Sequence, residues 1–158
     1  MKFKIEIWED NEILRKKCEN INKNEYSKYV KIWKEMVKYI KNPDNGWVWL
    51  AAPQIWINKR LIAVSLLKDY EDESFKTLIM INPEILEFSE ECEVDWEWCL
   101  SLPWESWDVS RPVKIKLKYY DEKQSEKVIF LEWLPARIVQ HEIDHIDWIL
   151  FTDKVIKK

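Results

Sequence analysis

Both histidines of the chain lie in one five-residue segment, His141-Glu142-Ile143-Asp144-His145. On a helix, residues four apart project from one face, so both imidazoles can reach the same metal ion. Glu142 follows the first histidine, where its carboxylate can reach a water on that ion without being a ligand. The pattern predicts a metal-dependent hydrolase. The simpler alternative is a polar helix face that carries two histidines by chance.

A catalytic metal site needs a third protein ligand, and the residues after His145 include neither histidine nor glutamate. Asp147 and Asp153 are the downstream carboxylates. Upstream, Cys99 lies in a short segment that can run beside the helix. A thiolate and two imidazoles leave the fourth position of a tetrahedral ion open for water, as a catalytic site requires. Taken alone, Cys99 is better explained as a small buried apolar residue.

Helices and strands must position these residues. Residues 26–41 place apolar side chains at helical spacing with lysines opposite, which predicts an amphipathic helix that the turn residues 42–46 end. Strand-like runs follow at residues 60–66, 77–81, 113–120 and 127–131. A second helical pattern, residues 136–151, carries both histidines and follows Pro135, which is tolerated in a first turn. A helix, several strands and a helix indicate an α+β fold.

Composition limits the remaining classes. A length of 158 residues predicts a single domain over residues 1–158. Apolar residues at 47% and charged residues at 34% exclude a disordered chain. A net charge of −4 with both signs interspersed argues against a nucleic-acid partner. The apolar runs are too short to span a bilayer, and the sequence shows no signal-peptide pattern. The three cysteines, Cys18, Cys92 and Cys99, lack disulfide spacing. We therefore expect a cytoplasmic protein without membrane partners.

Three motifs, in order along the chain, resemble those of the peptide deformylase family. The family's GxGLAAPQ corresponds to Trp47-Val48-Trp49-Leu50-Ala51-Ala52-Pro53-Gln54, and its EGCLS to Glu97-Trp98-Cys99-Leu100-Ser101. Its QHExDH matches Gln140-His141-Glu142-Ile143-Asp144-His145. Three ordered motifs are far more specific than HExxH alone, so the chain resembles this family along essentially its whole length.

The resemblance implies a site and a reaction. Cys99, His141 and His145 would hold a metal, typically Fe²⁺, with Zn²⁺, Ni²⁺ or Co²⁺ as substitutes. Glu142 would be the general base and acid, while the Gln54 side chain and the backbone N–H of Leu100 would bind the oxyanion. Substrates would be formylmethionyl ends of nascent peptides, met during a transient ribosome contact, and formate would be released. The implied fold packs antiparallel sheets around a central C-terminal HExxH helix, with an N-terminal amphipathic helix.

Substrate contacts follow from the same motifs. Val48, with Ile138 on the second helix, is expected to line a pocket for the methionine side chain, although ordinary core packing explains either residue equally well. Trp49 and Trp98 would stand where the substrate backbone approaches.

Tryptophan replaces glycine throughout these motifs. The chain has 11 tryptophans and one glycine, Gly46, where average usage predicts about 11 glycines. Ten tryptophans stand at positions expected to hold glycine, and only Trp33 lies on an apolar helical stripe. The ten are Trp8, Trp47, Trp49, Trp56, Trp96, Trp98, Trp104, Trp107, Trp133 and Trp148.

One hypothesis explains all ten positions: UGA codons that the organism reads as glycine have been translated as tryptophan. If the tryptophans are real, the alternative is an inactive, deformylase-like metal-binding protein with a blocked groove. A different zinc hydrolase built on HExxH is a further alternative, in which Cys99 is not a ligand.

Overall fold

A computed structural model describes residues 3–45 and 49–156. The expectations for Trp47 and Val48 therefore fall outside the described residues. The elements are α1 (Tyr26–Ile40) and α2 (Trp133–Ile146), the short 3₁₀ helices η1 (Lys23–Glu25), η2 (Ala52–Ile55) and η3 (Phe151–Lys154), and strands β1 (Trp49–Ala51), β2 (Leu61–Leu66), β3 (Lys76–Phe88), β4 (Cys92–Cys99), β5 (Leu102–Pro112), β6 (Lys114–Tyr120) and β7 (Glu126–Glu132). None of the described helices is both long enough and apolar enough to cross a bilayer.

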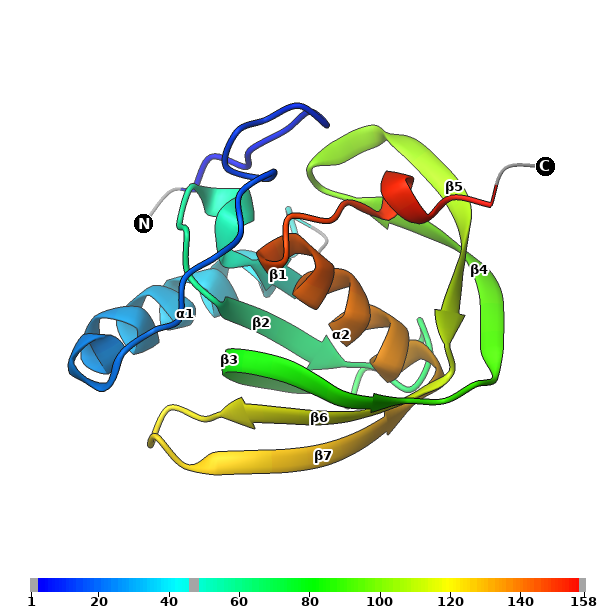
Figure 1. The fold of residues 1–158 in the computed structure, drawn as a ribbon. Coiled ribbons are helices and arrows are strands. Elements are labelled where there is room, and N and C mark those ends of the chain that lie inside the picture. Colours follow the sequence, from blue (N-terminus) through cyan, green and yellow to red (C-terminus); the bar gives the residue numbers. More distant parts are fainter. Residues whose placement is uncertain (1–2, 46–48, 157–158) are drawn as a thin grey trace.

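The described strands form two antiparallel sheets, as the α+β expectation requires. One sheet has the order β1-β2-β3-β6-β7, and the other is the β4–β5 ribbon. Figure 1 shows α2 lying between the five-stranded sheet and the β4–β5 ribbon, with α1 on the other side of β1 and β2. The HExxH helix is therefore central in the fold, with protein on both sides.

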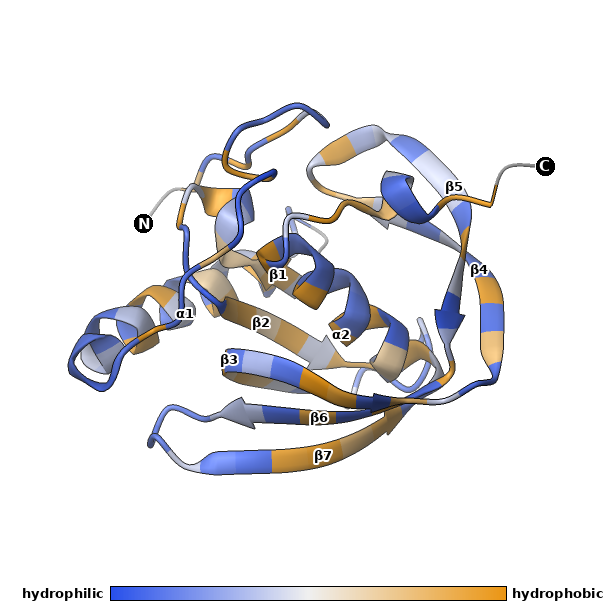
Figure 2. Ribbon diagram, viewed as in Figure 1, coloured by the Kyte–Doolittle hydropathy of each residue, from blue (hydrophilic) through white to orange (hydrophobic). Residues whose placement is uncertain are grey.

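Strand β2 is buried on both faces because α1 and α2 cover opposite sides of it. Leu61 and Ala63 pack toward α1, whereas Ile62 and Val64 join the cluster around α2. A strand buried on both faces needs a continuous apolar run rather than alternation, and Figure 2 shows β2 coloured as hydrophobic along most of its length. On β6, by contrast, buried apolar residues alternate with lysines, as predicted.

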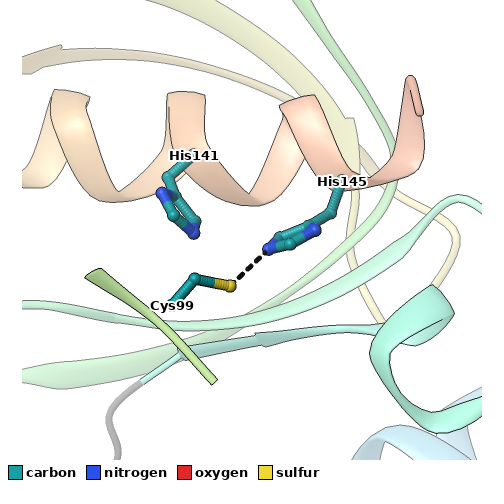
Figure 3. Close-up of side chains that lie close together, drawn as sticks. All are labelled: Cys99, His141 and His145. Atoms are coloured by element: carbon teal, nitrogen blue, oxygen red, sulfur yellow. Dashed lines mark hydrogen bonds between the residues drawn. The ribbon is translucent and has the colours of Figure 1, made fainter. Parts of the chain in front are cut away.

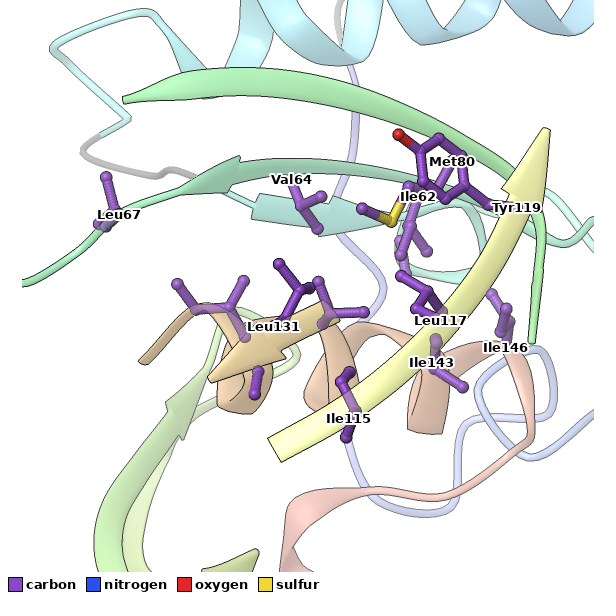
Figure 4. Packing of buried hydrophobic residues seen from close by; sticks show 14 of the residues in the cluster. Ile62, Val64, Leu67, Met80, Ile115, Leu117, Tyr119, Leu131, Ile143 and Ile146 are labelled. Atoms are coloured by element: carbon purple, nitrogen blue, oxygen red, sulfur yellow. The ribbon is translucent and has the colours of Figure 1, made fainter. Parts of the chain in front are cut away.

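The main core fills the space between α2 and the inner face of the five-stranded sheet. Ile143 and Ile146 of α2 meet Met80 of β3 and Leu117 of β6 there, all buried (Figure 4). This cluster fixes the orientation of α2 about its own axis. The opposite face of the helix, which carries both histidines, is therefore directed toward the β4–β5 ribbon.

The structure departs most from the sequence prediction at one strand, at the second helix and at the β4–β5 ribbon. The predicted strand at 77–81 extends through Phe88, because β-bulges after Ile81 and Ile85 accommodate Pro83 within the ladder. The second helix begins at Trp133 and ends at Ile146, five residues before the periodic pattern ends, because Trp148 adopts the left-handed conformation. The β4–β5 ribbon was not predicted, since its tryptophans and charges mask the alternation.

The position of Leu117 yields a test of this packing. We expect Leu117→Ala to reduce the free energy of unfolding by about 2–5 kcal/mol, because the side chain is fully buried and leaves a cavity. Val128→Ala on neighbouring β7 is the control, since Val128 is 48% exposed. Urea unfolding measures both. Equal losses for the two variants would contradict the assignment of the inner face.

Candidate metal centre

Three side chains from two elements converge at the end of β4. His141 and His145 project from α2, and Cys99 is the last residue of β4. One ligand atom from each lies within 4.8 Å of the others, and all three residues are buried. Figure 3 shows both imidazoles directed from the helix toward the thiol, with the Cys99 Sγ–His145 Nε2 contact of 3.1 Å dashed. The i, i+4 spacing and the predicted third ligand thus come together in one cluster.

This donor set fits a divalent transition metal. Two imidazoles and one thiolate suit Zn²⁺, Fe²⁺, Co²⁺ or Ni²⁺, whereas Mg²⁺ and Ca²⁺ prefer oxygen ligands. Nδ1 of His141 lies 2.9 Å from Oε2 of Glu97, which leaves its Nε2 for the cluster. A carboxylate behind a ligating histidine is the usual way in which proteins orient such a ring.

Glu142 is buried beside the cluster and lacks a partner among the described residues. Its side chain is completely buried, and neither carboxylate oxygen has a hydrogen-bond partner there. Burial raises the pKa of Glu142 to about 7. A buried carboxyl without a partner is costly to a structure that uses it only for packing, so this group is a candidate for proton transfer.

Gln54 reaches the cluster from η2. Its Nε2 lies 3.6 Å from Sγ of Cys99 and 3.3 Å from Oγ of Ser101. The backbone N–H of Ala51 donates to Oε1 at 2.9 Å, which fixes the amide orientation with Nε2 toward the site. Leu100 lies in the turn between β4 and β5, immediately after Cys99. The described geometry thus brings Gln54 to the site, while the role of the Leu100 N–H stays a prediction.

An apolar cavity opens beside His141. Trp49 of β1 and Trp98 of β4 line it, together with Ile138 of α2. The structure therefore brings these sequence-predicted substrate residues to one cavity next to the cluster. Tyr70, on the loop between β2 and β3, also lines the cavity, and sequence reasoning did not identify it.

A buried ion-pair network supports the cluster. Glu97 accepts hydrogen bonds from Arg111 Nε at 2.5 Å and Nη2 at 2.8 Å, and from Arg137 Nη1 at 2.8 Å. Nη1 of Arg111 also donates to Asp144 at 2.7 Å. Although burial alone raises the pKa of Glu97, the Arg111 and His141 contacts outweigh it and hold that pKa well below its usual range. Glu97 is therefore an ionised anchor for the His141 ring.

Sequence reasoning missed the two arginines of this network. The rarity of arginine could have indicated them, because only four of the chain's 25 basic residues are arginine. Each of the four makes an ion pair: Arg15, Arg60, Arg111 and Arg137. The planar guanidinium fork binds carboxylates in two-point fashion, which lysine cannot reproduce. In a lysine-rich chain, arginine therefore marks positions where fork geometry is required.

The ion-pair network predicts that a change at Glu97 weakens metal binding although all three candidate ligands are retained. We expect Glu97→Gln to weaken Co²⁺ binding by about 10- to 100-fold, because the His141 ring loses its charged anchor. Glu93→Gln, on the exposed edge of the same strand, removes the same charge and is the control. Competition with a chelator measures both affinities. Equal affinities would contradict the anchoring role of Glu97.

Comparisons with known proteins agree with this geometry. The sequence profile of the family described as Polypeptide deformylase matches residues 3–158. A peptide deformylase of Synechocystis sp. is 42% identical over 146 residues, covering 92% of this chain and 75% of that protein. One of Thermosynechococcus vestitus is 40% identical over 124 residues, covering 78% of this chain and 64% of that protein. The chain thus matches about two-thirds to three-quarters of the length of these relatives.

Solved structures are similar over nearly the whole chain. A probable peptide deformylase of Synechococcus phage S-SSM7 superposes with a TM-score of 0.85 at 35% identity, covering 97% of this chain and 99% of that one. A class I type b peptide deformylase of Acinetobacter baumannii, with Met-Ala-Ser bound, has a TM-score of 0.86 at 31% identity, covering 98% and 99%. Members of this family are metal-dependent enzymes that remove the N-formyl group from new polypeptides. The chain belongs to the peptide deformylase family.

Proposed function

We propose that this chain is a single catalytic domain that hydrolyses the formamide bond of N-formylmethionyl peptides and releases formate. The observation that carries the proposal is the buried Cys99–His141–His145 cluster, whose ligand atoms lie within 4.8 Å of one another beside an apolar cavity. Glu142, which lacks a hydrogen-bond partner in the described part of the chain, adjoins this cluster. A metal, a proton acceptor and an apolar pocket are the parts that this hydrolysis requires.

We infer that Cys99, His141 and His145 hold Fe²⁺, for which Zn²⁺, Ni²⁺ or Co²⁺ can substitute. The ion supplies Lewis acidity and lowers the pKa of water toward neutrality. A thiolate beside ferrous iron is open to oxidation, so the iron form should lose activity in air. Burial of all three ligands restricts access by bulk solvent and by competing chelators.

Glu142 moves the proton in the proposed reaction. Its carboxylate takes a proton from the water that attacks the formyl carbon and delivers it to the departing amine nitrogen. The Gln54 amide and the backbone N–H of Leu100 donate to the formyl oxygen as negative charge develops there. The hydrogen bond from Ala51 to Gln54 supports this role, because it holds the amide nitrogen toward the site before substrate arrives.

The substrate is a nascent peptide whose methionine side chain enters the apolar cavity. Trp49 and Trp98 adjoin the peptide there, and Val48 is proposed to contribute from the segment before β1. The Met-Ala-Ser peptide held by the similar Acinetobacter baumannii enzyme supports a peptide in the corresponding groove. Such substrates arise in the cytoplasm as chains leave the ribosome, where a transient contact would bring enzyme and substrate together.

The assignment of roles predicts that metal binding and catalysis separate by residue. We expect Cys99→Ala to lose Co²⁺ binding, whereas Cys92→Ala, an exposed cysteine of the same strand, keeps it. Glu142→Gln should keep the metal and lose about 10²- to 10⁴-fold in kcat, because only proton transfer is removed. Formate release from formyl-Met-Ala-Ser measures activity. Metal retention by Cys99→Ala would indicate a different HExxH hydrolase, and full activity of Glu142→Gln would overturn the proton-transfer role.

Because the side chains of Trp49 and Trp98 line the cavity, we expect their removal to increase activity. We expect Trp49→Gly/Trp98→Gly to raise kcat/KM by about 10- to 100-fold, because a bulky ring there displaces the substrate backbone from the cluster. Trp104→Gly/Trp107→Gly is the matched control, since these exposed indoles lie outside the cavity. Equal kcat/KM in the chain and both variants would contradict obstruction by Trp49 and Trp98.

A further inference from the structure

Four tryptophans have backbone conformations that suit glycine. Their φ angles are 86° at Trp8, 63° at Trp56, 56° at Trp133 and 57° at Trp148. Positive φ occurs in a few per cent of non-glycine residues and is a genuine outlier for bulky ones, because the β-carbon crowds the following carbonyl. At that frequency fewer than one of the ten described tryptophans should adopt it. Only two other non-glycine residues in the described chain do so, Asn82 and Gln124.

The hydrogen bonds at two of these positions require the left-handed conformation. After α2, the N–H of Ile149 donates to the carbonyl of Asp144 at 2.9 Å, across Trp148. After η2, the N–H of Ile57 donates to the carbonyl of Ala52 at 3.0 Å, across Trp56. In each case an N–H donates to the carbonyl of the residue five positions earlier. This hydrogen bond is typical of helix C-termini at which one residue, usually glycine, has the left-handed conformation. The fold thus demands this backbone whichever side chain is present.

The same tryptophans contribute little to the core. Trp8, Trp56, Trp133 and Trp148 are 44–60% exposed, although tryptophan is a strongly buried residue on average. The exception is Trp33, which lies within α1, has no positive φ and packs against the buried cluster between α1 and the sheet. Trp33 therefore differs in both backbone conformation and packing from the four tryptophans with positive φ.

We propose that the organism making this protein inserts glycine at the four strained positions, and at Trp47, Trp49, Trp96, Trp98, Trp104 and Trp107, by reading UGA as glycine. UGA is read as tryptophan in some genetic codes and as glycine in others, so one codon explains every replacement. The composition agrees, because ten exchanges would leave one tryptophan and 11 glycines, an ordinary content for this length. Trp33 is then encoded by UGG. This inference is independent of the proposed reaction.

The gene and the native protein test the proposal directly. We expect UGA at the ten positions and UGG at position 33, and tryptic peptides from the source organism whose masses contain glycine at 56, 133 and 148. UGG codons at these positions, or native peptides with tryptophan masses, would overturn it.

Variants of the expressed chain test the structural half of the argument. At position 148, we expect Trp148→Gly to melt about 2–4 °C above Trp148→Ala, because only glycine relieves the left-handed strain. At Trp104, which lies in β5 and has no positive φ, alanine should equal or exceed glycine. Trp33→Gly should lower Tm, since it removes packing from α1.

If Trp148→Ala melts at or above Trp148→Gly, the backbone does not call for glycine there and the structural argument fails. If the chain as written does not fold, the comparison is made in a background in which all ten tryptophans have been replaced by glycine. In that background, alanine instead of glycine at position 148 should lower Tm. Alanine instead of glycine at position 104 should not lower it. The opposite pattern would overturn the argument.

Discussion

The site depends on one buried carboxylate. Glu97 is 5% exposed and is held by three groups from two other elements: Arg111 of β5, and Arg137 and His141 of α2. A buried charge destabilises a fold unless its partners satisfy it fully. Glu97 therefore becomes favourable only when the β4–β5 ribbon and α2 are in their final positions. Those are also the positions that bring Cys99 to the two histidines, so formation of the ion-pair network is coupled to the convergence of the three candidate metal ligands.

Polar groups on α2 divide into those that hold the fold and those available for chemistry. Arg137 and Gln140 are buried but donate to backbone carbonyls of the ribbon, including Val109 and Pro112 of β5. Asp144 accepts hydrogen bonds from Arg111 and Lys154. Within the described chain, Glu142 alone on this helix has both carboxylate oxygens buried without a partner. The contrast singles out Glu142, because a residue present only for packing would not keep two unpartnered oxygens.

Local patterns predicted the parts of the fold that local physics determines. Helical spacing identified α1 and the histidine-bearing helix, and β6 follows its alternation of lysine and apolar residues. The β4–β5 ribbon escaped prediction because exposed tryptophans interrupt its pattern. Arg111 and Arg137 escaped because their partner Glu97 is 14 and 40 residues away in sequence. The candidate ligands could be predicted because HExxH places two of them on one helical face, and the motif around Cys99 indicated the third.

Strain in this molecule is separate from its chemistry. Backbone strain commonly collects at functional sites, where the surrounding structure sustains it. Here Gln54, Cys99, His141, Glu142 and His145 all have ordinary negative φ angles. The strained tryptophans lie instead at Trp8 and at ends of helices, and none of them lines the cavity beside His141. Because this strain lies away from the candidate site, we attribute it to the tryptophan side chains. A glycine at the same positions would adopt the same backbone conformation without strain.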